Sequence, residues 1–182
     1  MKEHPKRGYL QKILRVDLSS EKTSEEWVTP ELIYQYIGGT GLGIRLLWDE
    51  VKPGLDPYPP ENCLIFLTGP LTGTLVPGSG TYAVITKNTL TGLSASAQAN
   101  GFFGARLKYA GYDGIIIQGC ANRLVVLNIN DGRAEIEDGS DLKGKDTSES
   151  NLLLRRKSSR HFLEPSPGCI HPPFEFFLLY KT

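Results

Sequence analysis

Residues 62–112 read NCLIFLTGPLTGTLVPGSGTYAVITKNTLTGLSASAQANGFFGARLKYAGY, and we expect the central strands of the fold here. Cys63–Leu67 and Tyr82–Thr86 are short apolar runs bounded by turn residues, a pattern that is typical of buried strands. Residues 68–80 between them form a loop rich in glycine and threonine. Phe102–Ala110 has helical spacing and follows a predicted loop of small residues, 91–101.

The same 51 residues contain no Asp or Glu, although an even spread of the chain's 20 acidic residues would place about five or six there. They contain eight glycines, seven threonines and three serines, which offer bare backbone N–H groups and hydroxyl donors. This composition predicts that the segment binds an anionic ligand, such as one that carries phosphate.

The flanking segments add strands and helices. Tyr9–Leu18 and Thr23–Val28 predict an opening β-hairpin. Thr29 followed by Pro30 predicts a helix start, and that helix should end at Gly38 and Gly39. A second helix is predicted over 42–50, and further strands over 115–118, 124–129 and 133–137, the last two joined by a hairpin turn at 130–132. The fold class predicted is α+β, with more strands than helices.

The last 32 residues differ in composition from the rest. Residues 151–182 carry five Lys or Arg and two Glu, whereas residues 1–150 carry 15 basic and 18 acidic residues. Residues 152–156 can extend a helix, but the remainder is rich in proline and has no sustained periodicity. We therefore predict a domain over 1–150 and an atypical, poorly packed tail over 151–182.

The overall composition excludes several classes of function. With 20 basic and 20 acidic residues the net charge is zero, which argues against nucleic acid and membrane surfaces as partners. No apolar run approaches the length of a membrane helix, and the N-terminus lacks the apolar core of a signal peptide, so we expect a soluble, cytoplasmic protein. The three cysteines are far apart and fit neither a disulfide framework nor a metal knuckle.

Two segments are candidate binding elements, each with an ordinary alternative. Residues 68–80 could bind a ligand through bare backbone, or could be a wide surface loop, and they contain neither a P-loop nor a Rossmann fingerprint. Gln98 and Asn100 precede a predicted helix start, where amides either cap the helix or hydrogen-bond a heterocycle and its phosphates. The sequence leaves both pairs of alternatives open.

Few of the other polar residues and cysteines are assigned a function. Lys87 follows a strand and could face a phosphate, whereas Arg106 and Lys108 lie on a predicted helix and should be solvated. Cys63 and Cys120 are expected to be buried thiols. No catalytic residue and no metal ligand is assigned, and the three histidines, at positions 4, 161 and 171, have no partner at metal spacing.

A series of motifs in this order resembles a known family. They are RVDL (15–18), IGGTGLG (37–43), PENCLIFLTGPLTGT (60–74), TKNTLTG (86–92), GFFGARLKYAGYDGIII (101–117) and DLKGK (141–145). Together they resemble the N-terminal domain of the aldehyde ferredoxin oxidoreductases over roughly residues 8–150.

The resemblance implies a domain of two β-sheets with short helices that forms the base for a tungsten or molybdenum bis-pterin cofactor. It also implies a [4Fe-4S] cluster, ferredoxin as electron acceptor, conversion of aldehyde and water to carboxylate, and a homodimer at full length. The cofactor's phosphates and its anionic metal–dithiolene unit would account for the missing carboxylates.

The resemblance also suggests site residues. A family arginine that contacts pterin corresponds here to Thr81, and a family Asn-Ser-Gly contact corresponds to Gln98, Ala99 and Asn100. Thr81 brings a hydrogen-bond donor but no charge, and Gln98 places the amide on a longer arm. The expected cofactor-binding residues are therefore Thr81, Gln98, Asn100 and the Gly101 backbone, in a divergent branch of the family.

The ligands of the cluster and the catalytic residues of the family are expected in later domains, and this chain has no CxxCxxxC-type spacing. We therefore expect a truncated family member that binds the cofactor but is not catalytic alone. The alternatives are a stand-alone binding module for a phosphorylated small molecule and a non-functional fragment.

Overall fold

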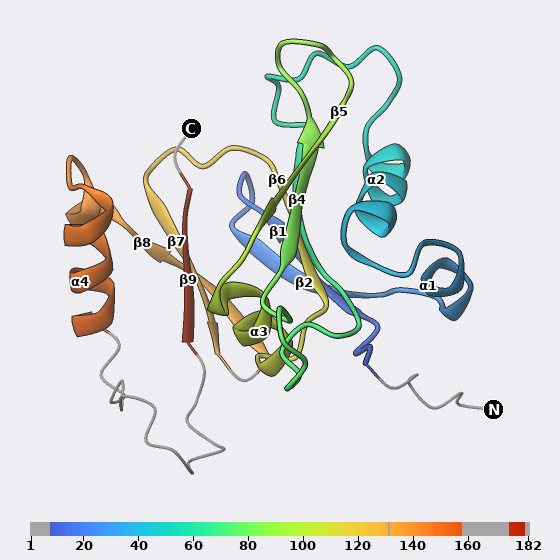
Figure 1. Cartoon of the computed structure of the whole chain (residues 1–182). Coiled ribbons are helices and arrows are strands. Elements are labelled where there is room, and N and C mark those ends of the chain that lie inside the picture. The colour runs from blue at the N-terminus through green and yellow to red at the C-terminus, as the bar shows by residue number, and fades with distance from the viewer. Residues whose placement is uncertain (1–7, 131, 158–174, 181–182) are drawn as a thin grey trace.

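The computed structural model describes residues 8–130, 132–157 and 175–180 of the chain. These residues form two β-sheets with short helices, so the predicted α+β class is confirmed (Figure 1). The larger sheet contains β1 (Lys12–Asp17), β2 (Lys22–Trp27), β3 (Cys63–Thr68), β4 (Tyr82–Lys87), β5 (Ser94–Ala99) and β6 (Gly114–Gln118). The smaller sheet contains β7 (Val125–Asn130), β8 (Arg133–Asp138) and β9 (Glu175–Tyr180). The helices are α1 (Pro30–Tyr36), α2 (Gly39–Glu50), α3 (Phe102–Tyr109) and α4 (Thr147–Lys157), with a 3-10 turn η1 (Ser140–Leu142).

The larger sheet has the order β2-β1-β6-β3-β4-β5. Its pairs are antiparallel except for β1 with β6, which run parallel. Strand β6 lies near the centre with both faces covered, and its sequence GIIIQ is accordingly an unbroken apolar run. Strands β2 and β5 form the two edges.

Helices α1 and α2 cover one face of the larger sheet (Figure 1). Helix α1 begins as the sequence predicts, because the Thr29 side chain accepts a hydrogen bond from Leu32 N and Pro30 opens the first turn. Helix α2 packs closely on β4 at Gly43, where an added Cβ would lie 2.3 Å from Ile85 Cδ1. The apolar side of α2 therefore rests directly on the central strands.

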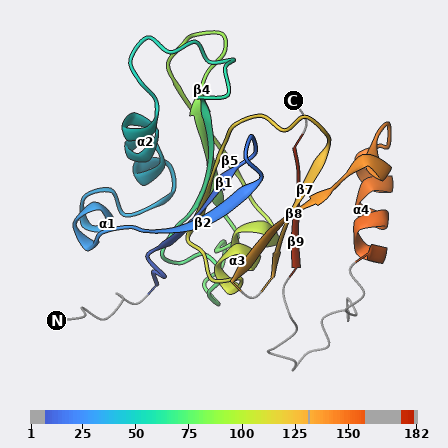
Figure 2. The same ribbon diagram turned by 180° about the vertical axis from the view of Figure 1, so that it is seen from behind.

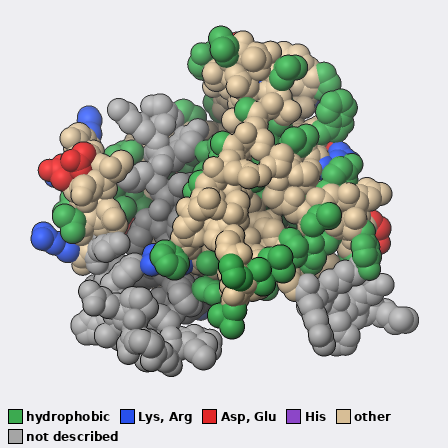
Figure 3. All heavy atoms as spheres, in the orientation of Figure 1, with side chains coloured by type: hydrophobic (Ala, Val, Ile, Leu, Met, Phe, Trp, Pro, Cys, Tyr) green, Lys and Arg blue, Asp and Glu red, His purple; other side chains and the backbone are tan. Residues whose placement is uncertain are grey.

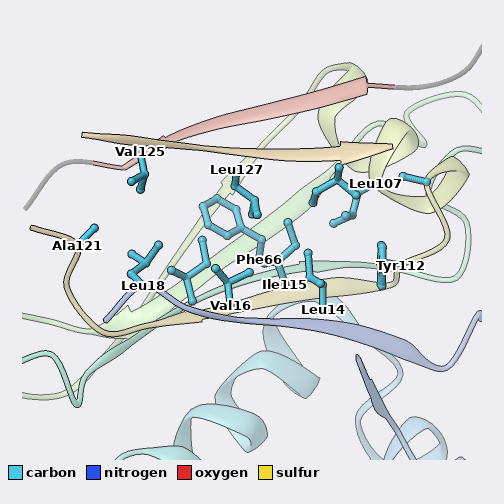
Figure 4. Packing of buried hydrophobic residues seen from close by; sticks show 13 residues of the cluster. Leu14, Val16, Leu18, Phe66, Leu107, Tyr112, Ile115, Ala121, Val125 and Leu127 are labelled. Atoms are coloured by element: carbon cyan, nitrogen blue, oxygen red, sulfur yellow. The ribbon is translucent and has the colours of Figure 1, made fainter. Parts of the chain in front are cut away.

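The smaller sheet and α3 cover the other face, and the main core lies between these layers (Figure 4). Val125 and Leu127 of β7 point toward Leu14 and Val16 of β1, with Phe66 of β3 between the layers. On the outer side of β7, Val126 packs with Leu142 and Leu154, which attaches α4 to the back of the smaller sheet (Figure 2).

Most local predictions are confirmed, and one is wrong. The β1–β2 and β7–β8 hairpins, α1, α3, β3, β4 and β6 lie where the sequence places them. Helix α2 begins at Gly39, three residues earlier than predicted. The segment predicted as a loop over 91–101 instead contains β5, which pairs with β4 along its whole length.

The predicted boundary at residue 150 falls within α4, whose last residues include the predicted helical extension. Strand β9 pairs antiparallel with β7. Residues 158–174 and 181–182 of the predicted tail lie outside the described residues, as do all three histidines, so the poor packing of the tail stays a prediction.

Candidate functional site

The candidate site lies where the start of β4, the end of β5 and the N-terminus of α3 meet. The β4–β5 register pairs Tyr82 with Ala99, which places Thr81 beside Asn100. The Thr81 hydroxyl donates a short hydrogen bond to Asn100 Oδ1. Because its oxygen is used in this way, Asn100 has two amide N–H donors for which the described residues provide no recorded acceptor.

Glycine allows the backbones to approach at this point. A Cβ added to Gly80 would lie 2.6 Å from the Gly101 carbonyl oxygen and 3.3 Å from Gly101 N. Gly101 itself has φ 122° and ψ −160°, a conformation that is essentially restricted to glycine. The sequence did not single out Gly80, and no local pattern distinguishes it from other loop glycines.

Gly101 is the N-cap of α3, and no side chain caps the helix. The first-turn N–H groups of α3 lie at the positive end of the helix. Among the described residues, no capping hydrogen bond from Gln98 or Asn100 is recorded. Gln98 lies on β5 opposite Ala83, with an exposed side chain and no recorded hydrogen bond to a described residue.

The glycine and threonine loop, residues 69–80, is closed by its own hydrogen bonds. The hydroxyls of Thr72, Thr74 and Ser79 donate to the carbonyls of Thr81, Leu71 and Thr74 respectively. The prediction that the hydroxyls of this loop are offered to a ligand is therefore wrong for these three side chains.

Aromatic side chains pack against one another next to the site and support it. The Tyr82 and Phe103 rings stack with centroids 4.2 Å apart, and Phe66 lies 5.4 Å from Phe103. Gly104 allows this approach, because a Cβ there would lie 2.9 Å from Thr72 Cγ2 and 3.3 Å from Tyr82 Cβ. Helix α3 is thus held against the loop and β4, which fixes the direction of its first turn.

The three basic residues of the acid-free stretch are not gathered at the site. Lys87 ends β4, five residues from Tyr82 and so about 17 Å away along the strand. The prediction that Lys108 is solvated is wrong, because its ammonium is buried 2.5 Å from Asp113 Oδ1 and 2.7 Å from the Gly8 carbonyl oxygen. Arg106 is partly buried. The N-terminus of α3 contributes backbone N–H groups to the site.

The surface around the site is largely uncharged, with hydrophobic side chains scattered over it (Figure 3). In that view the charged side chains lie mostly toward the margins of the molecule. Leu71, Leu75 and Val76 of the loop and Phe102 of α3 are exposed. Bare backbone, amide donors and the absence of carboxylates fit an anionic ligand with flat or apolar parts.

The other reactive groups lie elsewhere. Cys63 is buried, as predicted, and burial raises the pKa of its thiol to about 12, whereas Cys120 is only partly buried. Among the described residues, no group of three or more His, Cys, Asp or Glu is arranged to hold a metal. None of the described helices is both long and apolar enough to cross a membrane.

Comparison with known proteins gives a consistent result. Residues 13–167 match the family described as aldehyde ferredoxin oxidoreductase, N-terminal domain. The chain is 48% identical over 150 residues to the tungsten-containing aldehyde ferredoxin oxidoreductases of Pyrococcus horikoshii and Pyrococcus abyssi, covering 82% of this chain and 25% of each relative. It is 38% identical over 136 residues to the aliphatic sulfonate oxidoreductase, WOR-like subunit, of Pyrococcus furiosus, covering 73% and 22%.

Among solved structures, the chain resembles the active site complex BamBC of benzoyl coenzyme A reductase in complex with 1,5 dienoyl-CoA. The TM-score is 0.80 at 38% identity, over 83% of this chain and 23% of that chain. The chain therefore spans about a quarter of the length of the relatives that it matches.

Proposed function

Because the chain belongs to the aldehyde ferredoxin oxidoreductase family, through the N-terminal domain of that family, we propose that it binds an anionic tungsten–pterin cofactor. Two similar proteins are named as tungsten-containing. The observation that carries the proposal is the meeting of Thr81, Asn100 and Gly101 at the N-terminus of α3, within a stretch of sequence, 62–112, that contains no Asp or Glu.

The residues present fit such a group. The Asn100 amide and the first-turn N–H groups of α3 can donate to phosphate or ring oxygens, and Gly80 and Gly101 leave the backbone open to close approach. Gln98 can add a second amide from β5. We propose Thr81 as a positioning residue, because its hydroxyl fixes the orientation of the Asn100 amide.

The cofactor, when bound, would supply oxygen transfer and accept two electrons from an aldehyde, with ferredoxin as the final acceptor. The part of the protein described here would orient the pterin and keep carboxylates away from it. We propose that the reaction itself requires residues from the remaining three quarters of the family's length, so this chain alone should bind cofactor without turning over aldehyde.

The test is anaerobic purification from a tungstate-supplied host, followed by metal analysis and pterin fluorescence after oxidation. We expect tungsten and pterin without iron in the wild-type chain. Asn100→Asp should lower pterin content about tenfold, which corresponds to roughly 1.4 kcal/mol of repulsion. A wild-type chain without pterin and tungsten would contradict the proposal.

Asn88→Asp is the matched control. Asn88 lies at the opposite end of the β4–β5 hairpin, and its Oδ1 accepts from Leu90 N and Thr91 N, which an aspartate would also do. The same Asn to Asp change there should leave pterin content unchanged. Equal losses in both variants would show that charge anywhere on the hairpin matters, and not the site at Asn100.

A further inference from the structure

Asn100 and Gly101 form the one Asn-Gly pair in the chain. Asparagine is thermolabile before glycine in particular, because glycine has no side chain to keep its backbone nitrogen away from the preceding side-chain amide. Both residues are exposed, and they lie between β5 and α3, outside either element. The pair is therefore open to water and is not held in a strand ladder or a helix.

The backbone nitrogen of Gly101 is not engaged in the way that regular structure would engage it. Among the described residues, no hydrogen bond from Gly101 N is recorded. The pair Asp138 and Gly139 shows the contrast, because Gly139 N donates to Leu124 O at 2.8 Å. Gly101 N thus has no such bond to break before it approaches the Asn100 side chain.

Thr81 is placed to assist a reaction at Asn100. Its hydroxyl donates to Asn100 Oδ1, and the other acceptor near it, Gly78 O, is more distant at 3.4 Å. When a nitrogen adds to the amide carbon of Asn100, negative charge develops on this same Oδ1. A hydrogen bond to that oxygen strengthens as the charge develops, which lowers the barrier. The contact that orients the amide therefore also makes its carbon more electrophilic.

We propose that Asn100 deamidates spontaneously in the folded chain and that Thr81 accelerates the step. Gly101 N loses its proton to solvent and bonds to Asn100 Cγ, while the Cγ–Nδ2 bond breaks and the amide nitrogen takes up a proton and leaves as ammonia. Water then opens the resulting succinimide at either of its carbonyls, which gives aspartate or isoaspartate. Water is the one co-reactant, and no atom is oxidised or reduced.

The modification changes the candidate site. A carboxylate replaces the two N–H donors of Asn100, and isoaspartate also lengthens the backbone between β5 and α3 by one carbon. The aspartate product is chemically the Asn100→Asp variant, which we expect to hold less pterin. This consequence rests on the proposed function, whereas the modification itself does not.

Timed incubation of the whole chain, produced without tungstate, tests the proposal. Peptide mass spectrometry follows the replacement of NH2 by OH at Asn100, and an isoaspartyl methyltransferase assay detects isoaspartate. In native buffer Thr81→Val should slow the reaction about tenfold, the effect of losing one hydrogen bond to a charged oxygen. Thr81→Ser keeps the hydroxyl and should restore the wild-type rate. In urea, where the contact is lost, all three chains should react equally fast.

Asn88 is the matched control within the same hairpin. Its Oδ1 accepts from Leu90 N and Thr91 N, and the next residue, Thr89, is β-branched. The branched side chain hinders approach of the Thr89 nitrogen to the Asn88 amide. The Asn88 amide should therefore persist in folded samples in which the Asn100 amide is lost.

Two results would overturn the proposal. The first is an Asn100 amide that persists as long as that of Asn88 in the folded wild type, a comparison that does not depend on the folding of any variant. The second is an equal rate in native buffer for wild type and folded Thr81→Val, or folded Thr81→Ala if the valine variant does not fold.

The consequence for binding is measured separately. In chain purified from a tungstate-supplied host, the pterin-bearing fraction should be enriched in intact Asn100 over the pterin-free fraction. Equal Asn100 content in the two fractions would contradict a role of Asn100 in the proposed function and would leave the modification standing. Loss of the Asn100 amide is followed in the cofactor-free chain, so failure of one proposal is distinguishable from failure of the other.

Discussion

Replacing Asp113 by Asn should destabilise the protein more than any of the other single substitutions that we describe. Asp113 Oδ2 accepts from Leu10 N at 2.8 Å and Gln11 N at 2.7 Å, and Oδ1 accepts from Lys108 Nζ at 2.5 Å. The Lys108 and Asp113 side chains are only 8% and 9% exposed. This buried pair fastens the chain before β1 to α3.

An asparagine cannot reproduce these contacts in either orientation. With its oxygen toward Leu10 and Gln11, its NH2 group faces the Lys108 ammonium, donor against donor. With the amide turned round, the two backbone N–H groups lose their acceptor. In both cases the buried Lys108 ammonium loses its negative partner, so we expect a loss of about 3–5 kcal/mol in unfolding free energy.

Lys108→Met should cost less, about 1.5–3 kcal/mol, because the carboxylate keeps two backbone donors. The double variant leaves no unpaired charge, so its loss should be smaller than the sum of the two single losses by roughly 1–3 kcal/mol. Urea unfolding, followed by tryptophan fluorescence and circular dichroism, measures all four proteins.

The control is Asp49→Asn, which breaks the more exposed pair between Arg45 and Asp49 on α2. Pairs of this type contribute about 0.3–0.5 kcal/mol, so stability should hardly change. A loss below about 1 kcal/mol for Asp113→Asn, or strictly additive single losses, would refute the assigned role of the buried pair.

Three further predictions concern single positions. Gly80→Ala should lower pterin content and stability, because its Cβ would lie 2.6 Å from the Gly101 carbonyl oxygen. Gly69→Ala should be tolerated, because the nearest contact of its Cβ would be 3.8 Å away. Equal behaviour of the two variants in thermal melting and in the pterin assay would contradict the close approach at Gly80. A hydrogen bond from Arg15 lowers the pKa of Glu50. The extra unfolding free energy of the wild type over Glu50→Gln should therefore be full above pH about 4.5 and should decline as the pH falls through the lowered pKa. Urea titrations that show a pH-independent difference would be inconsistent with this. Burial raises the pKa of the Cys63 thiol to about 12, so Cys63 should resist iodoacetamide at pH 8 until the protein is unfolded. Peptide mass spectrometry can compare its labelling with that of the partly buried Cys120. Labelling of both cysteines at the same rate would show that β3 is open.

Local patterns were sufficient to predict most elements. Thr29 and Pro30 identify the start of α1, because capping and proline geometry depend on adjacent residues alone. The apolar runs of β3 and β4 and the turn between β7 and β8 are equally local signals. The order of the larger sheet is different, since the parallel pairing of β1 with β6 joins segments about 100 residues apart.

Strand β5 shows why one element was missed. SASAQA has no β-branched or aromatic residue, so its intrinsic strand preference is weak. Its conformation follows from the ladder with β4, which supplies the backbone hydrogen bonds that the side chains do not favour. The prediction for Lys108 was wrong for a related reason, because its ammonium donates to the carbonyl of Gly8, which lies 100 residues away.

Gln98 and Asn100 were singled out by their position before a predicted helix start, whereas Thr81 and the Gly101 backbone were added through the family resemblance. Thr81 and Asn100 are 19 residues apart, and only the β4–β5 register makes them neighbours. Whether Thr81, Gln98, Asn100 and Gly101 bind a cofactor stays a prediction. The contribution of Gly80 could not be predicted, because the value of a missing Cβ depends on the backbone opposite.

The absence of acidic residues from 62–112 has two separate causes. In most of β3, and at Ala83 and Ile85 of β4, the side chains are buried, and buried carboxylates without partners are too costly to occur. The exposed residues of β5 and of the loop 69–80 have no such constraint, so only they carry information about a ligand or partner. At Asn100, which is exposed, an anionic cofactor would repel a carboxylate. Asn100→Asp therefore tests repulsion by a ligand separately from the cost of burying a carboxylate.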